Sequence, residues 1–593
     1  MSTYTPPVKD ASFVLDQLVG LDQLCETLQL DEVNTELATV IIEEAGKLAS
    51  DVLAPLNRVG DEKGATVADG QVQETAGFAD AYQQFVENGW ATLTGPEAFG
   101  GQNLPNVIGT AVNELWHSSN MSFALCPMLS QGAVEALIAH GSDELKAQYL
   151  PPLISGEWTG TMNLTEPNAG SDLAAVAAKA TPAGDHYKIN GQKIFITWGD
   201  HQMTSNIVHL VLARLPDAPA GVKGISLFIV PKYLLDDQGQ PAELNDVSCI
   251  SLEHKMGIHG SPTCVMSFGD NDGAIGYLVG EENKGLSYMF TMMNHARQAV
   301  GLQGLSISER AYQQALEYSQ ERTQGSRKDG SKIAIIEHPD VRRMLMAMKA
   351  GNEAMRALAY RAAADIDHAH QGDPAAHARV DLYTPIVKGW MTELAQELTS
   401  LNIQVLGGMG FIEETGAAQH YRDARILPIY EGTTGIQAFD LIGRKTVYDK
   451  GAALKALHAD INDTLTQLSA SYSPQLALLH SKLKTALTHA TAAGEWILEN
   501  SASTPHTLGN VSFDNLMMMG YLTGGWLLAQ SALLASQLTT QDNPYGDAFL
   551  QGKIATACFY AEYFLPRVSQ HADTVLTGLS STFALTTEQM QGA

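Results

Sequence analysis

The hydrophobic pattern of this chain changes from helical to β-like and back again, and this change limits the folds that it can adopt. Apolar residues recur with a helical period over residues 37–155 and again over 283–446. Between them, residues 160–280 contain short β-branched runs, such as 207–212 and 225–230, separated by clusters of Gly, Pro, Asp and Asn. A β-rich segment flanked by helical segments predicts an α+β protein with its β-domain in the middle.

Further breaks in the pattern divide the 593 residues into five predicted segments. They are an N-terminal helical extension (1–36), an N-terminal α-domain (37–158), a middle β-domain (159–282), a C-terminal α-bundle (283–450) and an extra helical domain (451–593). The last boundary falls in the stretch Tyr448-Asp449-Lys450-Gly451, which has the composition of a linker. A hydrophobic content of 45% is enough for several buried cores.

Charge and cysteine content restrict the partners and the compartment. The formal net charge of −29 argues against a surface for nucleic acids or anionic membranes. The five cysteines are scattered and form no C-x-x-C pair, so neither a disulfide framework nor a thiolate metal site is indicated. Residues 1–10 have neither a basic nor an apolar targeting pattern. We therefore expect a cytoplasmic protein.

Residues 515–541 contain no charged side chain and are long enough to cross a membrane. Polar residues nevertheless interrupt the run, among them Gln530, Ser531 and Gln537. The surrounding pattern is that of a helical bundle. A buried or interfacial helix is therefore the favoured interpretation, without stable membrane insertion.

The strongest chemical signal is the stretch from Ile429 to Gln437, in which Glu431 is followed by Gly432, Thr433 and Thr434. Glycine after a carboxylate allows a close approach from the backbone side. That arrangement suits a general base which meets one substrate carbon in a dry pocket. Taken alone, the same residues are also typical of an ordinary helix N-terminus.

Several other motifs accompany this stretch in a fixed order. They are Met162–Asp172, Gly191–Thr197, Lys255-Met256-Gly257, Arg297, Arg322 and Gln404–Phe411. In this order and at these spacings, residues 40–446 resemble the acyl-CoA dehydrogenase family. The stretches 207–214 and 258–263, together with the long C-terminal extension, resemble the extended bacterial branch that includes 3-methylmercaptopropionyl-CoA dehydrogenases.

The resemblance implies a fold and a reaction. The fold would comprise an N-terminal helical domain, a middle β-barrel-like domain, a C-terminal four-helix bundle and an extra helical domain. The reaction would remove two hydrogens across Cα–Cβ of an acyl-CoA, giving the trans-2-enoyl-CoA. No side chain accepts a hydride, so a cofactor is required, and in this family it is FAD. Electrons would pass to an electron-transfer flavoprotein. In relatives of ordinary length, a second pair of subunits covers the outer face of the C-terminal bundle. Here the extra helical domain could cover that face itself, so we expect a homodimer.

The same resemblance assigns residues to the site. Glu431 matches the base; some branches carry the base at the position of Ala296, and alanine cannot serve. The expected FAD contacts are Met162, Leu164, Thr165, Gly170, Ser171, Phe195, Ile196, Thr197, Arg322, Gln404, Gly407, Gly408 and Thr433. The expected substrate contacts are Ser171, Asn294 and Arg297. Arg322 and the Gly407-Gly408 turn would serve the FAD of a neighbouring subunit.

The chain departs from the family pattern at several positions. Phe195 replaces the usual tryptophan, and Gly325 replaces the usual aromatic residue after Gln324. Pro339 follows His338 where the family has a His-Gln type pair, so the adenine-side contacts stay open. No metal-binding motif is present, and His368-Ala369-His370 is most simply explained as a polar surface.

Two alternatives to the dehydrogenase remain. One is an acyl-CoA oxidase, which also has a C-terminal extension and uses O2. The other is a non-catalytic, flavin-containing, DNA-protective relative with a basic C-terminal face. Residues 451–593 show no basic stripe, and the whole chain is acidic, which disfavours the second alternative. The sequence fixes neither the acyl chain length nor the physiological substrate.

Overall fold

The computed structural model describes residues 3–68, 70–502 and 506–592. The backbone divides into two compact units. The first, here called the helical unit, consists of Met1–Glu44, Pro105–Glu114 and Val300–Ala593. The second, the β-containing unit, consists of Ala45–Leu104 and Leu115–Ala299. The predicted N-terminal α-domain and middle β-domain therefore lie largely in one compact body.

Helices of the β-containing unit follow the predicted helical period. They are α4 (Ala54–Lys63), α5 (Phe78–Glu87), α7 (Met121–His140) and α8 (Asp143–Ser155). Helices α3 (Thr35–Leu48) and α6 (Asn106–Ser119) each continue from one unit into the other. A short hairpin, β1 (Thr66–Ala68) with β2 (Gln71–Gln73), interrupts the helical part, which the periodicity does not predict.

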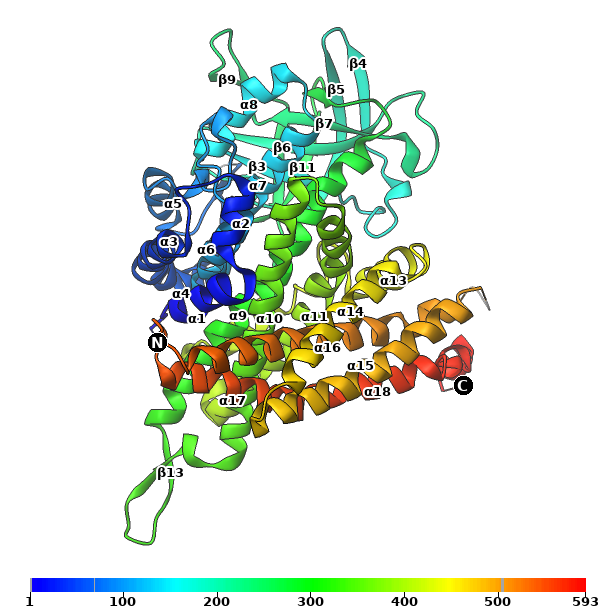
Figure 1. Cartoon of the computed structure of the whole chain (residues 1–593). Helices are drawn as coiled ribbons and strands as arrows, with labels where there is room; N and C mark the ends of the chain where they lie inside the picture. The colour runs from blue at the N-terminus through cyan, green and yellow to red at the C-terminus, as the bar shows by residue number, and fades with distance from the viewer. Residues whose placement is uncertain (1–2, 69, 503–505, 593) are drawn as a thin grey trace. The chain divides into compact units, whose positions relative to one another are not determined.

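The main sheet contains β3 (Trp158–Asn163), β4 (Lys179–Ala183), β5 (His186–Thr197), β6 (Asn206–Arg214), β7 (Ile225–Pro231), β10 (Val247–Leu252), β11 (Thr263–Phe268) and β12 (Ala274–Val279). Strand β5 pairs with β12, then β7, β6 and β4 follow in turn, and β4 pairs again with β5. The strands therefore close into a small barrel, extended by β11–β10 on one side and β3 on the other (Figure 1). Closure leaves few free strand edges. A separate hairpin is formed by β8 (Tyr233–Leu235) and β9 (Pro241–Leu244).

The barrel interior explains the continuous apolar runs in the sequence. Strand β7 is buried over its whole length and β6 over all but its last residue. A strand covered on both faces has no polar face, so it loses the alternating pattern. Val211, Phe228 and Phe268 belong to the resulting core.

Among the described residues, one helix has the length and composition of a membrane span. This helix is α7, and 83% of its most apolar window is buried inside the protein. Its N-terminus is capped by Asn120, whose Oδ1 accepts a hydrogen bond of 3.1 Å from the amide of Phe123.

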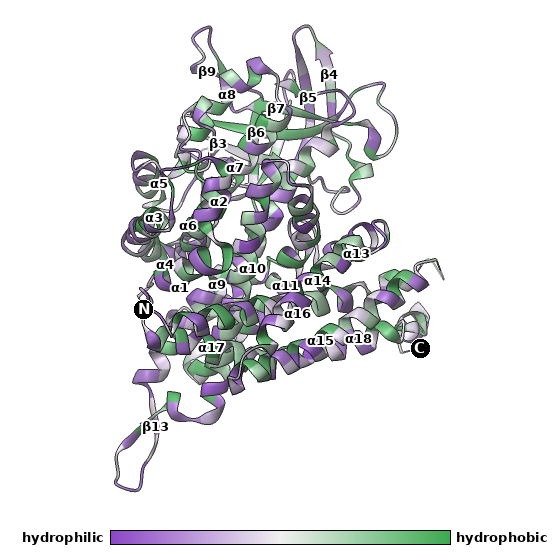
Figure 2. Cartoon of the chain, viewed as in Figure 1, coloured by the Kyte–Doolittle hydropathy of each residue, from purple (hydrophilic) through white to green (hydrophobic). Residues whose placement is uncertain are grey.

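The helical unit is built on long helices. They are α9 (Gly285–Glu321), α10 (Pro339–His370) and α11 (Pro374–Leu406), with the shorter α12 (Ala417–Ala424) and α13 (Thr434–Ile442). Helix α9 begins in the β-containing unit and continues into the helical unit. A hairpin of β13 (Thr323–Ser326) and β14 (Lys332–Ala334) follows it and projects from the helices (Figure 1). The hairpin tip is hydrophilic (Figure 2).

The N-terminal extension forms two α-helices. They are α1 (Val8–Phe13) and α2 (Leu21–Leu28), with a π-helical turn between them. Gly20 ends that turn with φ +73°, a left-handed conformation that glycine adopts without strain.

The extra C-terminal domain is helical, as expected. Its helices are α14 (Ala452–Ser469), α15 (Pro474–Asn500), α16 (Thr507–Leu538), α17 (Asp547–Tyr563) and α18 (Pro566–Leu576). The uncharged segment lies mainly in α16, which packs against α15, α17 and α18 and also against α10, α11 and α13. Leu516, Leu522 and Leu527 of α16 are fully buried. The segment is therefore a core helix of the helical unit.

Candidate active site

Glu431 lies in a tight turn directly before α13. Its φ is +55°, and that of Gly432 is +90°. The left-handed region is uncommon for a residue with a Cβ, and strained backbone of this kind tends to cluster at functional sites. Helix α13 then begins at Thr434, and Thr433 caps it by accepting a hydrogen bond of 3.3 Å from the amide of Ile436. The helix cap and the predicted base are thus parts of one turn, so the two interpretations of this stretch are compatible.

Three side chains that the motif itself does not single out hold this turn. Lys388 Nζ donates to the carbonyl of Gly432 at 2.6 Å. Gln437 Nε2 donates to the carbonyls of Glu431 and Gly432, both at 3.3 Å. Glu393 accepts a 2.6 Å hydrogen bond from the hydroxyl of Thr434. Only Gln437 is near Glu431 in sequence, so Lys388 and Glu393 on α11 carried no sequence signal.

Tyr430 links the turn to α9. Its hydroxyl donates a short hydrogen bond to Oε1 of Gln303. Burial raises the pKa of Tyr430, and the charge of Glu431 raises this pKa further. The phenol therefore stays protonated beside a half-buried carboxylate.

The predicted flavin segment in the β-containing unit leaves β3 and enters a turn. Met162, Leu164 and Thr165 are half-buried, whereas Gly170 and Ser171 are exposed. The carbonyl of Thr165 accepts a 2.9 Å hydrogen bond from the amide of Ile194 on β5. The structure thus brings the two predicted flavin segments of this unit together.

A buried ion pair, which sequence reasoning missed, fixes that turn. Lys193 is fully buried, and its Nζ lies 2.7 Å from Oε1 of Glu166 and 3.1 Å from the carbonyl of Leu164. Burial lowers the pKa of Lys193 to about 8, while the charge of Glu166 acts in the opposite direction. The carboxylate of Glu166 also accepts hydrogen bonds from the backbone amides of Ala177 and Ala178, at 2.7 and 3.1 Å. One carboxylate therefore ties the turn to both β5 and the approach to β4.

Phe195 has an unusual backbone and an exposed ring. Its φ is +60°, and 58% of the residue is exposed, although it lies in a β-strand. Its neighbours are anchored, because Ile196 pairs with Cys264 and Thr197 with Thr263 on β11. Trp198 is also left-handed, with φ +52°. The turned backbone presents an aromatic face that a flat ring system can cover.

The two predicted CoA-binding residues lie together on the first part of α9. Arg297 is only 5% exposed, and its Nη1 donates to Oδ1 of Asn294 at 3.3 Å. The guanidinium also lies 5.8 Å from the ring centroid of Phe290. Ala296, at the position of the alternative base, is buried and offers no acid–base group.

The remaining residues expected to contact FAD are exposed on the helical unit. Arg322 follows α9, and Gln404, Gly407, Gly408 and Thr433 are likewise open to solvent. Gly407 has φ +62°, and a Cβ at Gly407 or Gly408 would meet no atom within 4 Å. Open glycine backbone and a free-standing arginine fit the pyrophosphate of a dinucleotide.

The departure at Gly325 has a backbone reason. Its φ is +87°, which an aromatic residue adopts only with strain. Nε2 of His338 lies 2.9 Å from the carbonyl of Gln324 and braces the hairpin, and Pro339 starts α10. The hairpin is therefore held by its own contacts without the usual aromatic residue.

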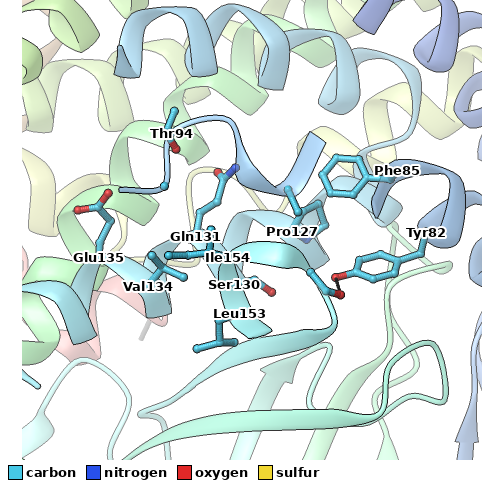
Figure 3. A pocket seen from close by; sticks show the side chains of 13 residues that line it. Tyr82, Phe85, Thr94, Pro127, Ser130, Gln131, Val134, Glu135, Leu153 and Ile154 are labelled. Carbon is cyan, nitrogen blue, oxygen red and sulfur yellow. Dashed lines mark hydrogen bonds between the residues drawn. The ribbon is translucent and has the colours of Figure 1, made fainter. Parts of the chain in front are cut away.

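A small cavity lies elsewhere in the β-containing unit, between α5, α7 and α8 (Figure 3). Its volume of about 20 Å³ is enough for one water. Tyr82, Ser130 and Gln131 contribute polar groups, and the Tyr82 hydroxyl donates to the carbonyl of Gly156 at 3.1 Å. No predicted site residue lines it, and it is too small for a nucleotide or an acyl chain.

Comparison with known families and proteins bears on this arrangement. Models of the acyl-CoA dehydrogenase N-terminal, middle and C-terminal domains match residues 35–157, 161–271 and 283–446. A model described as acetyl-CoA dehydrogenase C-terminal like matches residues 457–586. The last match shows that the extra helical domain is itself a recurring module.

Similarity to whole proteins extends over nearly the full chain. The 3-methylmercaptopropionyl-CoA dehydrogenase of Ruegeria pomeroyi is 46% identical, over 97% of this chain and 99% of the relative. The broad-specificity linear acyl-CoA dehydrogenase FadE5 of Mycobacterium tuberculosis is 33% identical, over 97% of this chain and 98% of the relative.

A solved structure shares the fold. The crystal structure of Caenorhabditis elegans ACDH-11 in complex with C11-CoA covers 98% of this chain and 96% of its own, with a TM-score of 0.78 and 20% identity. Two relatives are 46% and 33% identical to this chain over nearly its full length. The turn that carries Glu431 and the β-barrel also lie at the positions expected from the sequence. The chain therefore belongs to the acyl-CoA dehydrogenase family.

Proposed function

We propose that this protein catalyses the FAD-dependent α,β-dehydrogenation of an acyl-CoA thioester to the trans-2-enoyl-CoA. The observation that carries the proposal is the Glu431 turn, a carboxylate in a left-handed conformation held by Lys388, Gln437 and Glu393. Such restraint is expected where a base must meet a single carbon atom.

The chain's residues divide the chemistry as follows. The carboxylate of Glu431 takes the α-proton, while the β-hydrogen leaves with its electron pair as the Cα–Cβ double bond forms. Bound FAD supplies the acceptor for that hydride. Arg297 and Asn294 hold the CoA arm, and the backbone N–H of Glu431 donates to the thioester oxygen, where charge develops.

The fit to FAD rests on groups already described. Phe195 offers an exposed aromatic face, and the turn at Gly170-Ser171 offers exposed backbone. Arg322 and the Gly407-Gly408 turn offer a cation and open backbone on the other unit. Because these residues lie on the surface of their units, they suit a cofactor shared between two subunits. We therefore propose a homodimer. We also propose a cytoplasmic location, because the scattered cysteines fit a reducing compartment.

For the substrate, we propose 3-methylmercaptopropionyl-CoA or a short linear acyl-CoA. The support is the 46% identity to the Ruegeria pomeroyi enzyme and the 35% identity to a butyryl-CoA dehydrogenase of Syntrophomonas wolfei. A thioether sulfur and a methylene have similar shapes, so an apolar pocket separates them by little free energy. The ratio of kcat/KM for the two thioesters, measured with a ferrocenium-type acceptor, tests this assignment.

For the electron acceptor, we propose an electron-transfer flavoprotein. The flavin of the substrate-reduced protein should then stay reduced in air for much longer than one turnover takes. Addition of the electron-transfer flavoprotein should reoxidise it. Rapid, stoichiometric release of peroxide would instead indicate an acyl-CoA oxidase.

The central experiment replaces the base. Glu431→Gln should retain FAD and bind acyl-CoA, because the amide keeps the size of the carboxylate. Flavin bleaching by the substrate should slow by ~10²–10⁴, the usual contribution of one positioned base. Bleaching at the wild-type rate would show that another group removes the proton and would refute the proposal.

A further inference from the structure

A buried lysine, distant in the sequence, donates a hydrogen bond to the turn that carries Glu431. Lys388 has no exposed surface, and its ammonium donates to the carbonyl of Gly432 at 2.6 Å. A charge-assisted hydrogen bond of this length is among the stronger polar contacts in a protein. It acts on the residue directly after the base, at a position where φ is +90°.

Two further contacts show that α11 serves the whole turn. Glu393 lies five residues after Lys388 on α11. Its carboxylate accepts a hydrogen bond of 2.6 Å from the hydroxyl of Thr434. The amide of Thr434 donates to the carbonyl of Pro428 at 2.9 Å and closes the turn from the other side. Lys388 and Glu393 on one helix thus contact two different residues of the turn, Gly432 and Thr434.

The extra C-terminal domain packs on this stretch of α11. A Cβ at Gly389 would come within 2.5 Å of Leu516 on α16, and a Cβ at Gly520 of α16 within 2.0 Å of Trp390. Farther along α11, Arg567 of α18 makes a bidentate ion pair with Glu397, at 2.6 and 2.8 Å. Residues directly after Lys388 are therefore packed against α16 without free space.

We propose that Lys388 is a positioning residue for the reaction and that α16 holds it in place through Gly389 and Trp390. The inference rests on the proposed function, because it concerns the geometry of the same base. Glu431 occupies a strained left-handed conformation, which persists only if its surroundings fix it. Without the ammonium, the Gly432 carbonyl loses its shortest hydrogen bond, and the peptide unit between Gly432 and Thr433, which follows Glu431 in the turn, is free to rotate.

The test compares Lys388→Met with Lys388→Arg in the full-length holoenzyme. The first keeps length and removes the donor; the second keeps charge and donor. For Lys388→Met we expect flavin bleaching about 10²-fold slower, the order associated with a displacement of about 1 Å. FAD content and acyl-CoA affinity should change less than about threefold. Lys388→Arg should recover at least part of the rate.

A second readout does not depend on activity. Hydrogen exchange of peptides covering residues 430–437 should accelerate in Lys388→Met and return towards wild type in Lys388→Arg. The matched control is Lys553→Met, because Lys553 is also buried and ion-paired but contacts Asp10 and Glu353 rather than the turn. A loss of rate common to both Met variants would indicate general destabilisation and overturn the proposal.

The outcomes also separate this inference from the proposed function. If Glu431→Gln bleaches normally, the proposed function fails, whatever Lys388→Met does. If Glu431→Gln is inactive while Lys388→Met keeps wild-type bleaching and exchange, only the positioning role is refuted.

Discussion

At the scale of single residues, left-handed backbone marks both halves of the proposed chemistry. Phe195, Trp198 and Glu431 have φ values of +60°, +52° and +55°. Each such conformation costs on the order of 1–3 kcal/mol, and each aims a side chain in a direction that regular structure does not allow. At the Glu431 turn, the hydrogen bond from the fully buried Lys388 to the carbonyl of Gly432 opposes this strain.

His259 gives a pH-dependent prediction at the same scale. A hydrogen bond from the ring to Asp61 is the main reason that its pKa rises from 6.5 to about 9. Nδ1 lies 3.0 Å from Oδ1 of Asp61, and Nε2 lies 2.8 Å from the carbonyl of Lys255. Because the folded-state pKa is raised, the stabilisation is complete below about pH 6.5 and is lost as the pH rises through 9.

His259→Gln should therefore lower the free energy of unfolding by on the order of 1–2 kcal/mol at pH 6 and by much less at pH 10. Urea titrations of both proteins at the two pH values measure the difference. His186→Gln is the control, since its partner Asp185 is 96% exposed and such a pair contributes little. An equal effect of His259→Gln at both pH values would exclude the charged ring as the cause.

The local motif around Glu431 predicts a base at this position, but it does not predict the side chains that hold the turn. Gly432 and Thr433 are adjacent in sequence, and their turn chemistry can be read directly. Lys388 reaches the same turn only after α11 and α12 have folded back. Contacts of this kind depend on packing between elements, for which a single sequence has no local signal.

At the scale of elements, the long helices and the β-domain follow from periodicity, and the elements that periodicity misses are short. The β1–β2 hairpin has three residues in each strand, too few to show an alternating pattern. The long runs in β6 and β7 were readable because complete burial makes them uniformly apolar. Register within the sheet, and hence closure through β4, requires the pairings themselves.

Helix α16 supplies a prediction about packing between elements. Gly520→Ala would place a Cβ 2.0 Å from Cγ of Trp390, so the two helices must move apart. We expect a loss of ~1–3 kcal/mol in unfolding free energy, typical of overpacking, together with slower flavin bleaching.

Gly509→Ala is the matched control on the same helix, because its Cβ would meet no atom within 4 Å. Replacing an exposed helical glycine should stabilise by ~0.5–1 kcal/mol. The unfolding free energy from urea titration should therefore fall for Gly520→Ala and rise for Gly509→Ala, whereas the bleaching rate should fall only for Gly520→Ala. An unchanged bleaching rate in a destabilised Gly520→Ala would separate α16 from the active site.

At the scale of the whole molecule, a buried charge network joins segments distant in sequence within the helical unit. Arg356 pairs with Asp10 and with Glu114 at 2.5 and 2.6 Å, and Lys553 pairs with Asp10 and Glu353, both at 2.7 Å. Burial alone would raise the pKa of Asp10, but Lys553 and Arg356 hold it well below its usual range. The N-terminal extension and α17 are thereby fixed to α10, and loss of one partner would leave an uncompensated buried charge.

The last prediction concerns assembly. Truncation after Lys450 removes α14–α18 and uncovers the faces of α10, α11 and α13 on which α16 packs, including the fully buried Trp390. It also leaves Asp10 and Glu353 without Lys553. A surface this apolar associates in water, so light scattering should show a dimer for the intact chain and tetramers or aggregates for the truncated one. A monomeric intact chain with full FAD content would contradict the shared cofactor site. A soluble, dimeric and active truncation would show that the extra domain serves neither assembly nor the Glu431 turn.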